Sequence, residues 1–188
     1  MALHEFEGIG NHRLSAITEN NLGIGMLLMG NFKTAEFHLL RARKTFDCFD
    51  DRIRCAQVDE SLAQLYFAQD RFDAAKISID RAVQTMENGD EDAFLTEALT
   101  TKGLVYCKLK RYSQAKTLLE NAYRLAQRCG NSEGAGRSLA VLVEEMVNML
   151  EPEERNDLSN RLVEIVTGSQ KLLIQKRLEK CLTILANK

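Results

Sequence analysis

The sequence predicts an all-α protein built from stacked antiparallel helix pairs, and two observations support this. The first is a pattern of seven positions that recurs every forty residues without a gap. The second is the presence of one proline in 188 residues, which suits long uninterrupted helices. A fixed period in this range is typical of solenoids. The three copies are Gly23, Met26, Asn31, Phe32, Ala35, Leu39 and Ala42; Ala63, Tyr66, Arg71, Phe72, Ala75, Ile79 and Ala82; and Gly103, Tyr106, Arg111, Tyr112, Ala115, Leu119 and Ala122.

Each copy has the spacing of two helices joined by a tight turn. In the third copy, the small Gly103 precedes the large Tyr106 by one helical turn, so both lie on one face. A polar break follows, and then Ala115 and Ala122 lie two turns apart on one face of a second helix. The small residue lets the second helix approach closely. Neither helix can bury its apolar face alone, so the pairs must stack.

The forty-residue period assigns the whole chain to consecutive units. Glycine permits the left-handed conformation that ends helices, so we expect helices to stop at 88–90 and 129–131. Pro152 fits the first turn of a helix. We therefore expect helices over 12–29, 32–48, 52–69, 72–88, 92–109, 112–129, 133–150, from 151 onward, and 170–186. The units expected in this single array are the end of a truncated repeat at 1–11, repeats at 12–50, 51–90 and 91–130, a degenerate repeat at 131–167, and a capping helix at 168–188.

The pattern of glycine, tyrosine, an aromatic residue and spaced alanines resembles the tetratricopeptide repeat (TPR). The forty-residue length is similar to the long repeats of kinesin light chain and of bacterial TPR regulators. Two departures from the family are a missing proline near each unit's end and a missing tryptophan near each start, where Glu19, Asp59 and Leu99 stand instead. The resemblance implies a right-handed α-α superhelix whose first helices line a concave binding face.

Composition narrows the classes of partner and compartment. Net charge is −2 and no basic run occurs, so binding of nucleic acid through its phosphates is not supported. No apolar run reaches the length of a membrane span, and the first residues lack a signal-peptide core. The five cysteines include no CxxC pair, which favours reduced thiols in a cytoplasmic protein.

The sequence offers no catalytic, cofactor-binding or metal-binding constellation, so we expect a protein that is not an enzyme. No two of its three histidines lie one helical turn apart. Cys107 has no histidine neighbour and is better explained as a small packing residue. The acidic pairs at 144–145 and 153–154 are interpreted as solvated helix surface.

The resemblance assigns a groove to one face of the first helices. Asn20 suits a bond to a peptide backbone, because its amide both donates and accepts. Ile24 and Leu28 have an equally good explanation as packing sites for a missing preceding unit. The carboxylate clamp of TPR cochaperones is not supported, because only Asn20 and Lys108 are of the required types. The expected groove residues are Ile17, Asn20, Ile24, Leu28, Gln57, Glu60, Gln64, Phe67, Glu97, Thr100, Leu104, Lys108, Arg137 and Glu144.

Three functions remain open from the sequence. We favour a non-catalytic module that binds a peptide or partner protein in the groove. The alternatives are a sensor or regulatory domain of a larger signalling or transcription protein, and a self-association module that forms a homodimer through the ends of the array. Because function does not follow from fold alone, the sequence does not name the partner.

Overall fold

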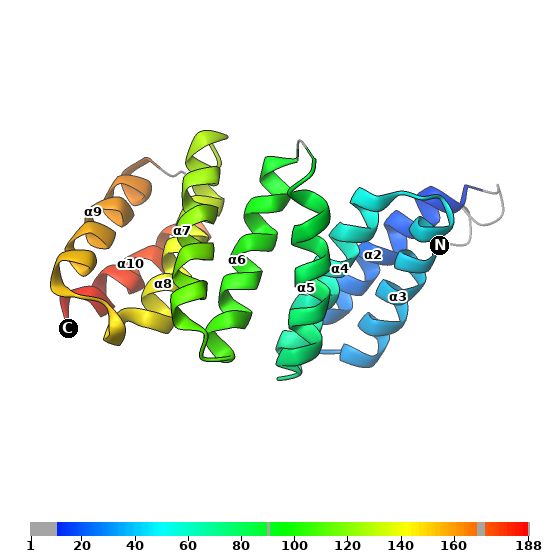
Figure 1. Ribbon diagram of the computed structural model, residues 1–188, viewed down its shortest axis with the longest axis horizontal. Helices are drawn as coiled ribbons and strands as arrows, with labels where there is room; N and C mark the ends of the chain where they lie inside the picture. Colours follow the sequence, from blue (N-terminus) through cyan, green and yellow to red (C-terminus); the bar gives the residue numbers. More distant parts are fainter. Residues whose placement is uncertain (1–10, 90, 169–171, 188) are drawn as a thin grey trace. The chain divides into compact units, whose positions relative to one another are not determined.

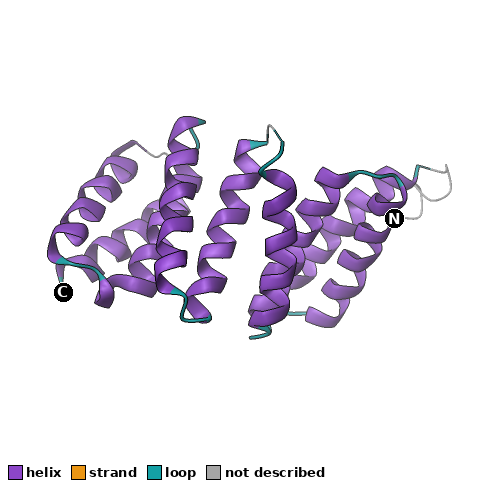
Figure 2. Cartoon of the chain, viewed as in Figure 1, coloured by secondary structure: helices purple, strands orange, loops and turns teal. Residues whose placement is uncertain are grey.

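The computed structural model describes residues 11–89, 91–168 and 172–187. Within these ranges every element is a helix and no strand occurs, as Figure 2 shows. The chain divides into two compact units, Met1–Asp90 and Glu91–Lys188. The predicted all-α architecture of stacked helix pairs is confirmed in both. The expected repeat end at 1–11 lies outside the described residues, apart from Asn11.

The first unit contains two antiparallel helix pairs (Figure 1). They are α2 (His12–Leu28) with α3 (Phe32–Cys48), and α4 (Arg52–Ala68) with α5 (Phe72–Met86). The core between the pairs combines Leu39 and Phe46 of α3 with Val58 and Leu62 of α4, all at most 2% exposed. Helix α3 therefore connects the two pairs, because it packs against α2 and against α4.

The second unit continues the alternation with α6 (Asp92–Lys108), α7 (Tyr112–Arg128), α8 (Ser132–Met146), α9 (Pro152–Gly168) and α10 (Leu172–Ala186). Helix α8 lies at the centre of this unit and packs against all four of its neighbours. Its own residues are accordingly almost all buried from Gly134 to Val143.

The helices begin at a constant interval. Their first residues are 12, 32, 52, 72, 92, 112, 132, 152 and 172, so a new helix starts every twenty residues along the described chain. The forty-residue repeat of the sequence is therefore two equal half-repeats. The helix expected as a cap at 168–188 begins in the same register, at the position of a further first helix.

Five of the connections between helices share one turn geometry. After α2, the N–H of Asn31 donates to the carbonyl of Met26 at 2.9 Å and the N–H of Gly30 donates to that of Leu27 at 2.9 Å. This is the Schellman arrangement, with Gly30 left-handed at φ +74°. The Asn31 side chain then accepts from the N–H of Thr34 and caps α3. In this turn, three residues end one helix and begin the next.

The same turn recurs with other residues at the left-handed position. Gly130 has φ +69°, whereas Asp50, Asp70 and Lys110 take φ values of 50°, 57° and 59° without being glycine. Left-handed backbone costs a residue with a Cβ about 1–2 kcal/mol. The turn geometry is thus maintained even where the sequence disfavours it.

The small residues of the repeat permit close helix contact, as predicted. A Cβ added to Gly23 would lie 2.6 Å from Cγ of Leu39, and a Cβ added to Gly103 would lie 2.6 Å from Cγ of Leu119. The intervening copy has Ala63 in this place. A side chain at these two positions would therefore press against the leucine of the second helix, whereas glycine leaves room for it.

Two turns differ from the expected pattern. Helix α5 ends at Met86, two residues before the stop expected at 88, and Gly89 does not take a positive φ. Helix α8 ends at Met146 and a short 3₁₀ segment (Val147–Met149) follows. Leu150 is then extended and buried, which brings Pro152 to the first position of α9.

Candidate interaction surface

The residues expected to line the groove lie on α2, α4, α6 and α8, the first helices of their pairs. In the first unit α2 and α4 pack against each other, so their side chains form one surface. Ile17 and Ile24 are half-buried on α2, and Leu28 is 83% exposed at its end. This portion is apolar, as the sequence indicated.

The α4 portion of this surface carries amides and one aromatic ring. Gln64 donates from Nε2 to Oε1 of Glu60 at 2.6 Å, one turn apart on the helix. The ring of Phe67 meets the ring of Phe72 edge to face, with centroids 5.6 Å apart. Gln57, two turns before Gln64 on the same helix, is half-buried. Phe67 is thus held in position by the helix that follows it.

Asn20 is half-buried on α2. Its Oδ1 atom is buried and has no hydrogen-bond partner among the described residues. A buried amide oxygen without a donor is costly to the fold, and an atom without accessible surface is out of reach of a partner.

At the equivalent positions of the second unit, ion pairs join the first helices of neighbouring pairs. Arg137 of α8 pairs with Glu97 of α6. Lys108 of α6 pairs with Glu145 of α8 at 2.7 Å, and Glu144 of α8 accepts from Arg177 of α10 at 2.8 Å.

The two remaining predicted residues of the second unit offer little surface. The side chain of Thr100 is buried, and its hydroxyl donates to the carbonyl of Thr96 at 2.9 Å. Leu104 is half-buried. The polar inner residues predicted for this unit therefore already have partners within the fold.

Two buried carboxylates occupy the column where the TPR pattern has tryptophan. Glu19 is 2% exposed and pairs with His38 and, at 2.9 Å, with Arg41. Asp59 is 3% exposed and accepts from Arg43 at 2.7 Å and from Arg81 at 2.8 Å. A buried charge requires such partners. Acidic side chains thus replace the ring as the contact between the helices of these pairs.

Sequence reasoning noted these acids only as departures from the family. The pattern that could have revealed the pairs is a second forty-residue spacing, because Arg41 and Arg81 repeat with the same interval as Glu19 and Asp59. In the third copy Leu99 replaces the acid and Asn121 replaces the arginine, so neither member of the ion pair is present.

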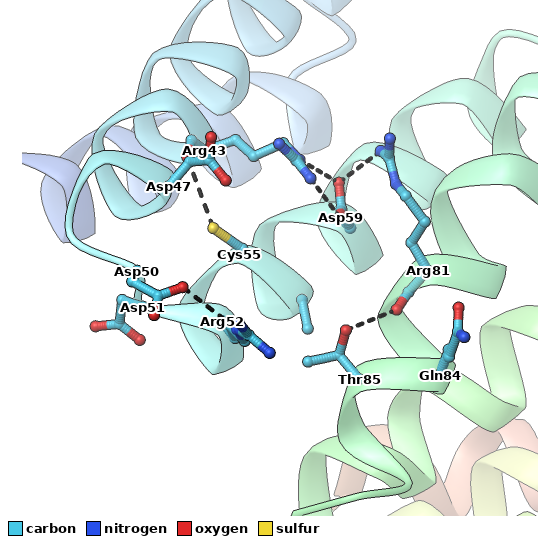
Figure 3. A pocket seen from close by; sticks show the side chains of 11 residues that line it. Arg43, Asp47, Asp50, Asp51, Arg52, Cys55, Asp59, Arg81, Gln84 and Thr85 are labelled. Atoms are coloured by element: carbon cyan, nitrogen blue, oxygen red, sulfur yellow. Dashed lines mark hydrogen bonds and ion pairs between the residues drawn. The ribbon is translucent and has the colours of Figure 1, made fainter.

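Asp59 forms the wall of a pocket of about 210 Å³ in the first unit, drawn in Figure 3. Hydrogen bonding to Asp59 raises the pKa of Arg43, although burial opposes this. Both guanidinium groups that reach Asp59 are held by it, one from each side (Figure 3). Three further aspartates, at 47, 50 and 51, line the same pocket, so it presents charges of both signs.

The same depression recurs at equivalent positions of other helix pairs. Between α2 and α3 it has a volume of about 450 Å³ and is lined by His12, Arg41, Lys44, Thr45, Cys48 and Phe49. In the second unit it has about 330 Å³ and is lined by Leu99, Asn121, Arg124, Leu125 and Arg128. None of these three depressions is lined by a residue predicted for the groove. This edge of the helix pairs was not predicted from the sequence.

Other chemistry receives no support from the described residues. No group of three or more histidine, cysteine or acidic side chains lies close enough to hold a metal ion within those residues. Cys107 is buried, and burial raises the pKa of its thiol to about 11. In the described part of the chain, no helix is both long and apolar enough to cross a bilayer.

These features define a helical repeat fold of stacked antiparallel pairs. Comparison with solved structures finds a similar fold in BtubC (BKLC) from P. vanneervenii, with a TM-score of 0.62. The two chains are 16% identical, and the similarity covers 99% of this chain and 86% of BtubC. At this identity the likeness is one of fold. No protein-family model matches the sequence, and no curated protein matches it either.

Proposed function

We propose that this chain is a non-catalytic, TPR-type interaction module of the cytoplasm. In this proposal, α2 and α4 bind a segment of a partner protein on their shared surface. The observation that carries it is the contrast between the two units: inner residues of α6 and α8 are joined by ion pairs, whereas α2 presents Ile17, Ile24 and Leu28.

Burial of these apolar side chains supplies the driving force. Leu28 is 83% exposed, and full burial of a leucine stabilises by about 1.5–3 kcal/mol. Ile17 and Ile24 add the parts of their side chains that remain in water. A partner segment with apolar side chains at helical spacing fits a row of this kind.

The amides beside this row would give the partner its orientation. Gln57 and Gln64 carry both donors and acceptors, so they can pair with a backbone or with polar side chains. The partner would therefore combine apolar anchors with uncharged hydrogen-bonding groups.

Site-specific photocrosslinking tests this proposal. A benzophenone amino acid replaces Phe67, which lies on the proposed surface, or Ile77, which is 62% exposed on α5. We expect one partner to crosslink from position 67 and not from position 77. Leu28→Asn should abolish that crosslink without changing the circular dichroism spectrum.

Equal crosslinking from both positions would contradict the proposal, as would a crosslink that survives Leu28→Asn. A crosslinked product with the mass of two identical chains would instead assign the surface to self-association.

A further inference from the structure

We propose that two copies of this chain form a dimer through one face of α2, which we call the leading face. Its residues follow one another at spacings of three and four, so they lie on one side of the helix. This interaction does not depend on the partner surface proposed above. The residues of the leading face are Leu14, Thr18, Asn21, Leu22, Gly25 and Met29.

The repeat shows what covers the corresponding face of the next first helix. Leu22 of α2 lies forty residues before Leu62 of α4, which is 2% exposed in the core shared with α3. Gly25 likewise precedes Leu65, which is fully buried in the same core. On α4, therefore, this face is covered by the second helix of the preceding pair.

On α2 the leading face is open. Leu22 is 36% exposed and Met29 is 68% exposed. A Cβ added to Gly25 would meet nothing within 4 Å. The described helices α3 and α4 pack against other sides of α2, where Ala16 and Gly23 are buried. The leading face therefore offers the geometry of a helix–helix contact whose second helix is not among the described residues.

The leading face is also uncharged along its length. Between Arg13 and Lys33, the only charged residue in the sequence is Glu19. Glu19 is buried and pairs with His38 and Arg41, so its charge does not reach this surface. Depletion of charged side chains is characteristic of the core of protein interfaces.

A face without charge suits a second copy of the same chain in particular. A two-fold dimer brings the same residues of both chains together, so a charged side chain near the axis would meet its own copy. Other first helices carry such charges at equivalent positions: Arg54 of α4 corresponds to Leu14, and Lys102 of α6 corresponds to Leu22. The leading face of α2 has none.

The polar residues of the leading face are self-complementary as well. Asn21 is exposed, and its amide both donates and accepts hydrogen bonds. It can therefore pair with the same amide of a second copy, which neither a carboxylate nor an ammonium group could do.

Sedimentation equilibrium of the full chain tests the proposal. Leu22→Glu and Asn21→Asp each place a carboxylate on the leading face, and Asn21→Asp does so with almost no change in shape. The matched controls are Val163→Glu and Asn160→Asp, which introduce the same charge at exposed positions of α9. Circular dichroism verifies that each variant is folded.

We expect the mass of the wild-type chain to rise from that of one copy to that of two as the concentration enters the micromolar range. Leu22→Glu should weaken the dimer at least about tenfold, because two carboxylates would be buried side by side. Asn21→Asp should weaken it about tenfold at low salt and less at high salt, since salt screens the repulsion. The two control variants should change the dimer affinity less than about twofold.

Three results would overturn the proposal. One is a mass of a single chain at every concentration. Another is a dimer that Leu22→Glu and Asn21→Asp leave intact, because the contact would then lie elsewhere. The third is an equal loss of affinity in the controls, which would indicate repulsion between whole chains.

A monomeric chain would also show whether a different protein occupies the face. If Leu22→Glu then abolished the partner crosslink from position 67, the leading face would belong to that partner. If the crosslink survived, the partner surface would stand and only the dimer would be refuted.

Discussion

Two glycines of α2 should respond to the same substitution with opposite signs. A Cβ added to Gly23 would lie 2.6 Å from Cγ and 2.7 Å from Cδ2 of Leu39, and 3.3 Å from the carbonyl oxygen of Ala35. A Cβ added to Gly25 would meet nothing within 4 Å. Both residues lie inside one helix, two positions apart.

The expected magnitudes follow from two opposing effects. Replacing glycine by alanine inside a helix stabilises by about 1 kcal/mol at either position. Overpacking against a buried side chain costs about 1–3 kcal/mol, and only Gly23 incurs it, because Leu39 is fully buried. We therefore expect Gly25→Ala to stabilise by about 1 kcal/mol. Gly23→Ala should destabilise by about 0–2 kcal/mol, the balance of the two effects.

Urea denaturation followed by circular dichroism measures both variants, and the difference between them isolates the packing cost. The comparison is valid if the slope of the unfolding free energy against urea is unchanged. Adding Leu39→Ile to Gly23→Ala copies the combination of Ala63 and Ile79 and should recover part of the loss. Equal stabilisation by both substitutions would refute the close approach of α2 and α3.

Three further predictions test other parts of the fold. Lys110→Gly should stabilise by about 1 kcal/mol in the same assay, because Lys110 is held at φ +59°; a loss of stability would contradict the turn geometry. Asp59→Asn should destabilise by about 1–3 kcal/mol, because two arginines lose their carboxylate, and a neutral result would refute the buried pairing. At pH 8, iodoacetamide should modify the exposed Cys48 and Cys129 first, and Cys107 only after unfolding, because its pKa is raised to about 11 and the thiol stays protonated and buried. Mass spectrometry of the labelled peptides checks the order.

The repeat made the helices predictable from sequence. Gly103 was predicted from spacing alone to let the second helix approach closely, and the structure brings Leu119 of that helix against it. The residues of each helix pair are close in sequence, and their pattern recurs three times in the chain. The repetition made the pattern recognisable from a single sequence.

The turns and the polar contacts were less predictable. Gly89 has the identity of a helix stop, yet α5 ends before it, because a glycine permits a left-handed residue without requiring one. The buried ion pairs of Asp59 with Arg43 and Arg81 join residues from three helices, so Asp59 alone does not indicate them. The depressions could not be predicted either, since they depend on how far the helix ends separate.

The three-residue turns have a consequence for how this protein can diversify. Five of its connections are only long enough to end one helix and cap the next, so those five offer no loop that could receive an insertion. Many folds vary their binding properties through loop length while a rigid scaffold stays constant. Here a change in length would shift every downstream helix out of phase with the repeat. New binding specificity must therefore arise by substitution of side chains on helix faces, or by gain or loss of whole forty-residue repeats.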